Sequence, residues 1–133
     1  MSGDAPSDWE RVETRRRDFL ALAGSLDPAQ WDTPSLCEGW RVRDVVGHVV
    51  WLATSAAPEV VREVLLAGGR ADRALEGTAR VVGSLPKEDV LRQLEGAVAS
   101  RLIVPTVAPA NLAADLLVHL SDIRRPLGIA TAA

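Results

Sequence analysis

Apolar residues recur at intervals of three and four along most of this chain, which is the spacing of helices that bury one face. Between about Ser7 and about Ser25 they are interspersed with Glu and Arg. We therefore predict an amphipathic helix there, with Ser7 as its N-cap. No segment shows the clean two-residue alternation of a half-buried strand. The pattern predicts an all-α protein.

Proline and glycine set the expected ends of the later helices. The stretch 27–40 holds two Pro and one Gly, which is typical of an ordered loop. A second helix should begin near Arg41, be kinked or restarted at Pro58, and end at Gly68 and Gly69. Further helices are expected over 71–83, from about Lys87 onward, and over roughly 110–124, the last one ending before Pro126 and Gly128.

The length and cysteine content favour a simple intracellular domain. At 133 residues the chain fits one domain, which we take as residues 1–133 with a core of about 7–128. Cys37 is the single cysteine and cannot form an internal disulfide, and the N-terminus lacks the pattern of a secretion signal. The longest nearly uncharged apolar stretch, Val45 to Val61, is interrupted and too short for a bilayer span. We expect a cytoplasmic protein with no membrane contact.

The charges of the chain nearly balance. Fifteen basic and eighteen acidic side chains give a formal net charge of −3. Nucleic-acid-binding domains carry a clear positive excess, so we expect no nucleic-acid partner.

Three polar side chains fall on apolar helix faces. His48 stands among valines at offsets that place it on the buried face of its helix. Asp115 and His119 are one helical turn apart, on or beside the apolar stripe of the last helix. A carboxylate and two imidazoles can form three sides of a tetrahedron around Zn²⁺ and leave one position open, as catalytic zinc sites do. We therefore predict a metal site at His48, Asp115 and His119.

Simpler explanations of the same residues stay open. An Asp and a His one turn apart often share only a surface hydrogen bond, and a histidine among valines is commonly bonded to a backbone carbonyl. Asp44 and Asp122 could orient the imidazoles of His48 and His119. For Asp44 we favour a helix-start acid stabilised by the dipole, and for Asp122 a surface ion pair with Arg125.

Two stretches near the ends of the chain carry the most specific motifs. Residues 26–48 contain Cys37-x-Gly39-Trp40 followed by His48. Residues 117–128 contain the run His119-x-x-Asp122-Ile123-Arg124-Arg125-Pro126-Leu127-Gly128. In this order the motifs resemble the mycothiol-dependent maleylpyruvate isomerase family. The middle of the chain, about 54–110, is similar only in helical character and in its glycine and proline breaks.

The resemblance implies a DinB-like up-and-down four-helix bundle that holds a divalent metal, usually zinc. Carried over position by position, the ligands are His48, Asp115 and His119, although the best-known member has Glu where Asp115 stands. The implied partners are mycothiol, a low-molecular-weight thiol, and a small electrophilic substrate. In the family the thiolate adds to the double bond of maleylpyruvate, the bond rotates, and the thiol leaves to give fumarylpyruvate. Arg124 and Arg125 are candidates to hold anionic groups, although cations at a helix end also stabilise the dipole.

Two classes of function stay open. The first is a metal-dependent thiol transferase or isomerase with no catalytic side chain beyond the metal site, in which Cys37 packs in its loop rather than attacking. The second is a shortened, non-catalytic bundle that binds metal or a partner protein, because relatives commonly continue beyond the five residues that follow Gly128 here. The sequence also leaves open a homodimer that closes the open side of the pocket.

Overall fold

The computed structural model describes residues 5–130, and within this range it contains seven helices and no strand. An isolated antiparallel bridge joins Pro34 and Arg41. The all-α prediction is confirmed. The helices are α1 (Asp8–Ser25), α2 (Pro28–Trp31), α3 (Val42–Thr54), α4 (Ala57–Leu66), α5 (Ala71–Gly83), α6 (Lys87–Gly96) and α7 (Pro109–Leu127).

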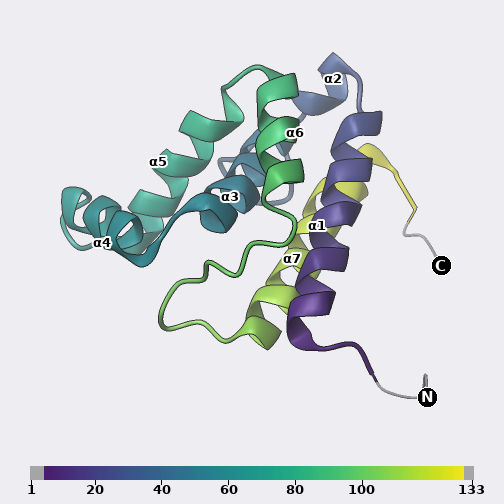
Figure 1. Ribbon diagram of the computed structural model, residues 1–133. Helices are drawn as coiled ribbons and strands as arrows, with labels where there is room; N and C mark the ends of the chain where they lie inside the picture. Colours follow the sequence, from purple (N-terminus) through teal and green to yellow (C-terminus); the bar gives the residue numbers. More distant parts are fainter. Residues whose placement is uncertain (1–4, 131–133) are drawn as a thin grey trace.

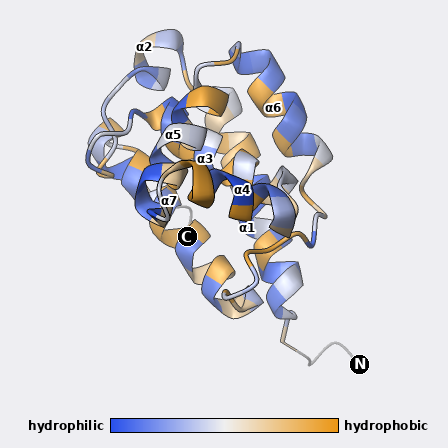
Figure 2. Cartoon of the chain, turned by 90° about the vertical axis from the view of Figure 1, so that its left-hand side faces the viewer, coloured by the Kyte–Doolittle hydropathy of each residue, from blue (hydrophilic) through white to orange (hydrophobic). Residues whose placement is uncertain are grey.

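The four longest helices form the bundle of the DinB-like type. Helix α1 lies along α7, α3 packs on α5, and α6 contacts both α1 and α3 (Figure 1). Helix α4 packs on α5, at the side of the molecule away from α1 and α7. Apolar and hydrophilic residues alternate along the helices (Figure 2), and the apolar ones converge on a common core. Fully buried members include Val12, Phe19, Val46, Leu94 and Leu120.

The first helix begins as its sequence predicts. The Ser7 hydroxyl accepts the Glu10 backbone N–H at 3.1 Å, and the Glu10 carboxylate accepts the Ser7 N–H at 3.4 Å. This reciprocal pair satisfies two N–H groups that an uncapped helix would leave free. Pro58 restarts the second helical arm as α4, and Gly68 and Gly69 end that arm with positive φ angles of 69° and 83°.

Helices α3 and α5 cross at two glycines. A methyl group at Gly47 would collide with the Ala79 carbonyl and the Gly83 backbone, and one at Gly83 would lie 2.6 Å from the Arg43 carbonyl oxygen. Side chains at these positions would force the helices apart, so the close crossing requires glycine. Because His48 follows Gly47 directly, this crossing also sets the depth at which His48 lies in the bundle.

Two expected boundaries are wrong. The 27–40 loop contains the short helix α2, which Asp27 and Gln30 cap reciprocally, with Pro28 in its first turn. The last helix begins at Pro109 and continues through Pro126 to Leu127, whereas we expected it to end before that proline. The carbonyl oxygen that Pro126 leaves without a helical partner, that of Asp122, accepts the Leu36 N–H at 3.0 Å. The helix therefore ends at Gly128, whose φ of 67° is left-handed.

No helix among residues 5–130 is both long enough and apolar enough to cross a lipid bilayer.

Candidate metal centre

The structure brings together the three side chains that the sequence analysis singled out. His48 comes from the middle of α3, and Asp115 and His119 come from successive turns of α7. One ligand atom from each of the three lies within 4.8 Å of the other two. His48 therefore meets two residues of α7 that lie at least 67 positions further along the chain.

The distances within the group are compatible with one small cation. His119 Nε2 lies 3.2 Å from an Asp115 carboxylate oxygen. The His48 and His119 rings meet edge to face, with their centroids 5.1 Å apart. Donors on a tetrahedral zinc ion are about 3.3 Å apart, because each lies about 2.0–2.1 Å from the metal. The Asp115–His119 pair already has that separation.

A buried nitrogen of His48 lacks a partner. His48 is 5% exposed, and its Nδ1 makes no hydrogen bond to any residue in the range 5–130. The simpler explanation, a histidine whose Nδ1 donates to a backbone carbonyl, therefore does not describe this residue. Leaving such a group unsatisfied costs about 1–3 kcal/mol. A bound cation would give this nitrogen a partner, so the three side chains fit a metal site better than a purely structural role.

Asp115 lies at the edge of the buried stripe rather than within it. Its side chain is 53% exposed, whereas that of His119 is 11% exposed. The carboxylate is therefore not an unpartnered charge in an apolar core: it faces both the His119 ring and a neighbouring cavity.

The local charges favour the protonation state of a metal ligand at His48 and Asp115, and the protonated state at His119. Burial, helped by the charge of His119, lowers the pKa of His48 to about 4, so its ring is neutral at pH 7. The hydrogen bond with His119 holds the pKa of Asp115 below its usual value. Burial lowers the pKa of His119, but Asp115 and Asp122 outweigh it, and the net pKa is raised. A metal ion would have to displace a proton from His119 alone.

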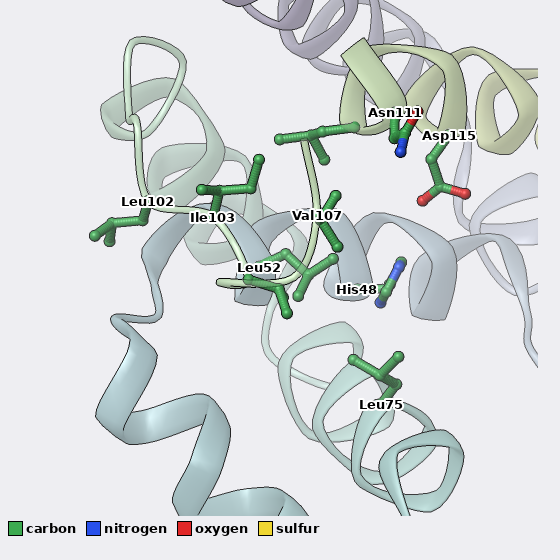
Figure 3. A pocket seen from close by; sticks show the side chains of 10 residues that line it. His48, Leu52, Leu75, Leu102, Ile103, Val107, Asn111 and Asp115 are labelled. Atoms are coloured by element: carbon green, nitrogen blue, oxygen red, sulfur yellow. The ribbon is translucent and has the colours of Figure 1, made fainter. Parts of the chain in front are cut away.

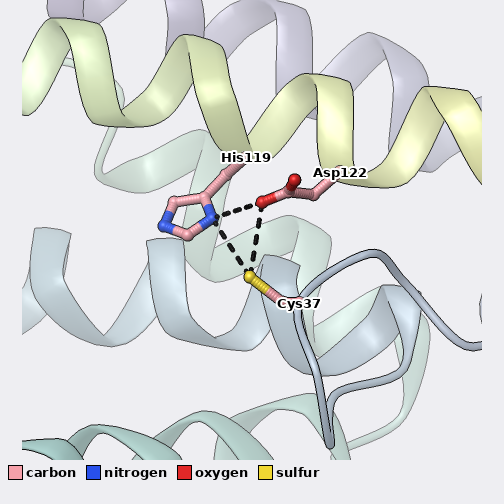
Figure 4. Close-up of side chains that lie close together, drawn as sticks. All are labelled: Cys37, His119 and Asp122. Carbon is pink, nitrogen blue, oxygen red and sulfur yellow. Dashed lines mark hydrogen bonds and ion pairs between the residues drawn. The ribbon is translucent and has the colours of Figure 1, made fainter.

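Asp122 orients His119 from the side opposite Asp115. Its carboxylate lies 3.3 Å from His119 Nδ1 (Figure 4). Our expectation of a surface ion pair between Asp122 and Arg125 is wrong, since the structure pairs this carboxylate with His119 and Cys37. A carboxylate on one ring nitrogen fixes the tautomer and leaves the other nitrogen free to bind.

Asp44 lies in the first turn of α3 and caps the start of this helix, as we expected. One carboxylate oxygen accepts the Arg41 backbone N–H at 3.0 Å, and both oxygens pair with the Arg41 guanidinium. This arrangement anchors the start of α3 and raises the pKa of Arg41.

Cys37 and Trp40 lie beside the two histidines. The sequence motif contains both residues, but the spacing along the chain did not predict these contacts. Cys37 Sγ lies 3.3 Å from an Asp122 oxygen and 3.8 Å from His119 Nδ1 (Figure 4). Cys37, His119 and Asp122 thus form a second group of converging donors. Burial and the Asp122 hydrogen bond raise the pKa of the Cys37 thiol to about 12, so it stays protonated at pH 7. The Trp40 ring lies 5.0 Å from that of His48 and 6.5 Å from that of His119.

A cavity of about 350 Å³ opens beside His48 and Asp115 (Figure 3). Apolar side chains from α3, α5 and the segment before α7 form most of its wall, together with Asn111. Arg124 and Arg125 lie in the last turn of α7 and do not line this cavity. At 1.5 Å per residue, Arg124 is about 13 Å further along the helix axis than Asp115.

The chain matches a known protein family over most of its length. Residues 12–114 match the family model described as the mycothiol maleylpyruvate isomerase N-terminal domain. The chain belongs to this family. The match covers Cys37, Trp40 and His48 and ends one residue before Asp115. Comparisons with curated proteins and with solved structures give no match. The resemblance in the sequence motifs is therefore confirmed at the level of the family.

Proposed function

We propose that this protein holds a divalent metal ion, with zinc as the first candidate, through His48, Asp115 and His119, and uses it to activate a low-molecular-weight thiol. The observation that carries the proposal is the convergence of these three donors around a buried His48 nitrogen that lacks a partner. Membership of the mycothiol maleylpyruvate isomerase N-terminal domain family supports mycothiol as the thiol.

The donor set suits the chemistry of zinc. Two imidazoles and one carboxylate occur together in catalytic zinc sites, where an exchangeable ligand takes the fourth position. A zinc ion bound there would lower the pKa of a thiol and so supply thiolate at neutral pH.

The residues around the donors have distinct tasks in this proposal. Asp122 holds the His119 ring through Nδ1, which leaves Nε2 for the metal. Trp40 lies against both imidazoles and helps to exclude water. Cys37 donates to Asp122 and remains a thiol, so the nucleophile comes from the cosubstrate.

The reaction class is the addition of a thiolate to an electrophilic carbon. In an isomerase, a carbon–sulfur bond forms at an activated double bond, the remaining single bond rotates, and the same carbon–sulfur bond breaks, so the thiol is returned. In a transferase, the carbon–sulfur bond persists and the adjacent carbanion takes a proton. Both reactions need a reduced thiol pool, as found in the cytoplasm.

A second candidate is a bundle that binds metal or a partner protein without turnover. Helix α4 favours this alternative, because Val61, Leu65 and Leu66 are 52%, 70% and 69% exposed. Clustered exposed apolar side chains commonly mark contact surfaces between proteins, including those between two copies of one chain.

Metal analysis and spectroscopy separate the two candidates. Protein purified without chelators should contain about one zinc ion per chain, and His48→Ala should lose it while keeping its helical circular dichroism. Adding thiol to the cobalt-substituted protein should shift its visible absorption bands if a thiolate reaches the metal. A cobalt spectrum that thiols leave unchanged would favour the binding protein.

A pair of isosteric variants controls for indirect effects. Asp115→Asn removes the ligand charge at the site and should weaken zinc retention. Asp72→Asn makes the same change at a side chain that is 74% exposed in the first turn of α5, and should retain zinc. Folded, chelator-free protein without metal would contradict the proposal.

A further inference from the structure

We infer that the electrophile taken by this site is an uncharged molecule with an apolar body, and that it lies in the cavity beside His48. This inference rests on the proposed function, because it concerns the substrate of the same site. Its basis is the composition of the cavity wall: Leu52 comes from α3, Leu75 from α5, and Ile103 and Val107 from the segment that connects α6 to α7 (Figure 3).

The cavity has the size of a small-molecule site. Its volume is about 350 Å³, which falls within the range of about 300–1,000 Å³ that such sites occupy. Its polar side chains, His48, Asn111 and Asp115, lie on one side of the cavity (Figure 3), whereas the remainder of the wall is aliphatic. A ligand would therefore place a reactive polar end near His48 and an apolar body against the leucines and valines.

The wall offers no positive charge to a carboxylate. Among residues 5–130, no Lys or Arg lines the cavity, and its ionised residue, Asp115, is an acid. A bound metal could neutralise one carboxylate of a substrate. The second carboxylate of a dicarboxylate would then lie among aliphatic side chains without a partner, which is strongly unfavourable.

The buried cation Arg16 binds backbone carbonyl groups. Arg16 does not line this cavity but borders a smaller space of about 10 Å³, also lined by His48 and Asp115, which has room for one water molecule at most. Its Nη1 donates to the carbonyl oxygens of Ala97, Val98 and Ser100, at 3.4, 3.4 and 2.6 Å. Arg16 thus anchors the segment that walls the cavity rather than contributing a charge to it.

A pair of inert ligands that differ only in charge tests this inference. Diethyl succinate and succinate share one carbon skeleton and cannot react with thiols. On the zinc-loaded protein, ligand-observed NMR should show that the diester binds at least about tenfold more tightly than the dianion, a difference of one decade in Kd. Succinate binding as tightly as the diester, or more tightly, would overturn the inference.

Cavity-filling variants locate the ligand. Val107→Phe should weaken diester binding about tenfold or more. Ile103→Trp, which also fills the cavity from the segment between α6 and α7, should weaken it as well. Val81→Phe adds the same ring at a side chain of α5 that is 70% exposed, and it should have no effect. Leu102→Lys, at a partly exposed position of the wall, should instead improve succinate binding. Diester binding that neither filling variant weakens would contradict the assigned cavity.

Zinc content measured in the same samples keeps the two proposals distinct. A protein that holds zinc but prefers succinate contradicts the ligand class alone. A protein that holds no zinc but binds the diester through Val107 contradicts the proposed function and supports the ligand class. As a check on reactivity, thiol-dependent conversion of diethyl maleate to diethyl fumarate should exceed the uncatalysed rate by a larger factor than conversion of maleate does.

Discussion

The backbone N–H of Leu36 donates a hydrogen bond to the carbonyl oxygen of Asp122, with a nitrogen–oxygen distance of 3.0 Å. In an unbroken helix that oxygen would accept from residue 126, but Pro126 has no N–H. The loop that carries Cys37 is therefore held against α7, where the Cys37 thiol contacts Asp122 and His119. A proline near one end of the chain thus helps to position a loop near the other end.

Pro126→Ala should loosen this loop and leave α7 helical. Alanine supplies an N–H that competes with Leu36 for the Asp122 oxygen, and the loss of one hydrogen bond of about 1 kcal/mol corresponds to a roughly fivefold change in loop opening. Hydrogen exchange of the Leu36 amide and alkylation of Cys37 should accelerate by this factor. Pro109→Ala, at the first position of α7, frees no helical carbonyl and is the control. Equal exchange rates in both variants would show that another contact holds the loop.

Asp122→Asn should weaken zinc binding although it removes no ligand. The amide keeps the size of the side chain but loses the charge that orients His119 through Nδ1, and such substitutions typically reduce metal affinity about 10–100-fold. Competition with a chromophoric chelator measures the change. Cys37→Ser keeps a hydrogen-bond donor to Asp122 and should have a smaller effect. An Asp122→Asn protein with unchanged affinity would rule out this orienting role.

The two histidines should titrate far apart in the zinc-free protein. Burial lowers the pKa of His48 to about 4, whereas Asp115 and Asp122 overcome the burial of His119 and raise its pKa. Proton NMR of the ring Hε1 signals should therefore show one midpoint near pH 4 and another above pH 6.5. Superimposed titrations near pH 6.5 would mean that the rings are solvated and do not meet.

These shifts act on stability in opposite directions. The stability associated with neutral His48 is fully present above the unfolded pKa of about 6.5 and is lost as the pH falls towards 4, by about 3 kcal/mol. The stability associated with protonated His119 is present below about pH 6.5 and is lost as the pH rises through its raised folded pKa. Urea unfolding of the zinc-free His48→Ala protein should therefore show a smaller loss of stability between pH 6.5 and pH 4 than the wild type.

Gly47→Ala should destabilise the protein by about 2 kcal/mol or more, because a methyl group there collides with the backbone of α5. Gly77→Ala is the matched control, since a methyl group at Gly77 meets nothing within 4 Å. That change should stabilise α5 by up to about 1 kcal/mol, the difference in helix propensity between glycine and alanine. Urea denaturation measures both effects, and a Gly47→Ala protein as stable as the wild type would show that the helices can move apart.

Local sequence was sufficient for most of the helical framework. The capping pair Ser7 and Glu10 marks the start of α1, and the predicted range 71–83 coincides with α5. Helical periodicity also placed His48 on a buried face and put Asp115 and His119 one turn apart, because these are relations between residues a few positions apart. The structure departs from the prediction at α2 and at Pro126, where contacts beyond the segment decide the boundary.

The sequence by itself therefore determined most of the helices, the family and the three polar side chains that the structure brings together. Only the tertiary structure decided that Asp122 pairs with His119 rather than with Arg125, that Cys37 joins them across 82 positions, and that an aliphatic cavity opens beside His48. The physical reason is that periodicity reports which face of a helix a residue occupies. It does not report which loop will pack on that face, since such contacts form only when distant segments meet in the folded core.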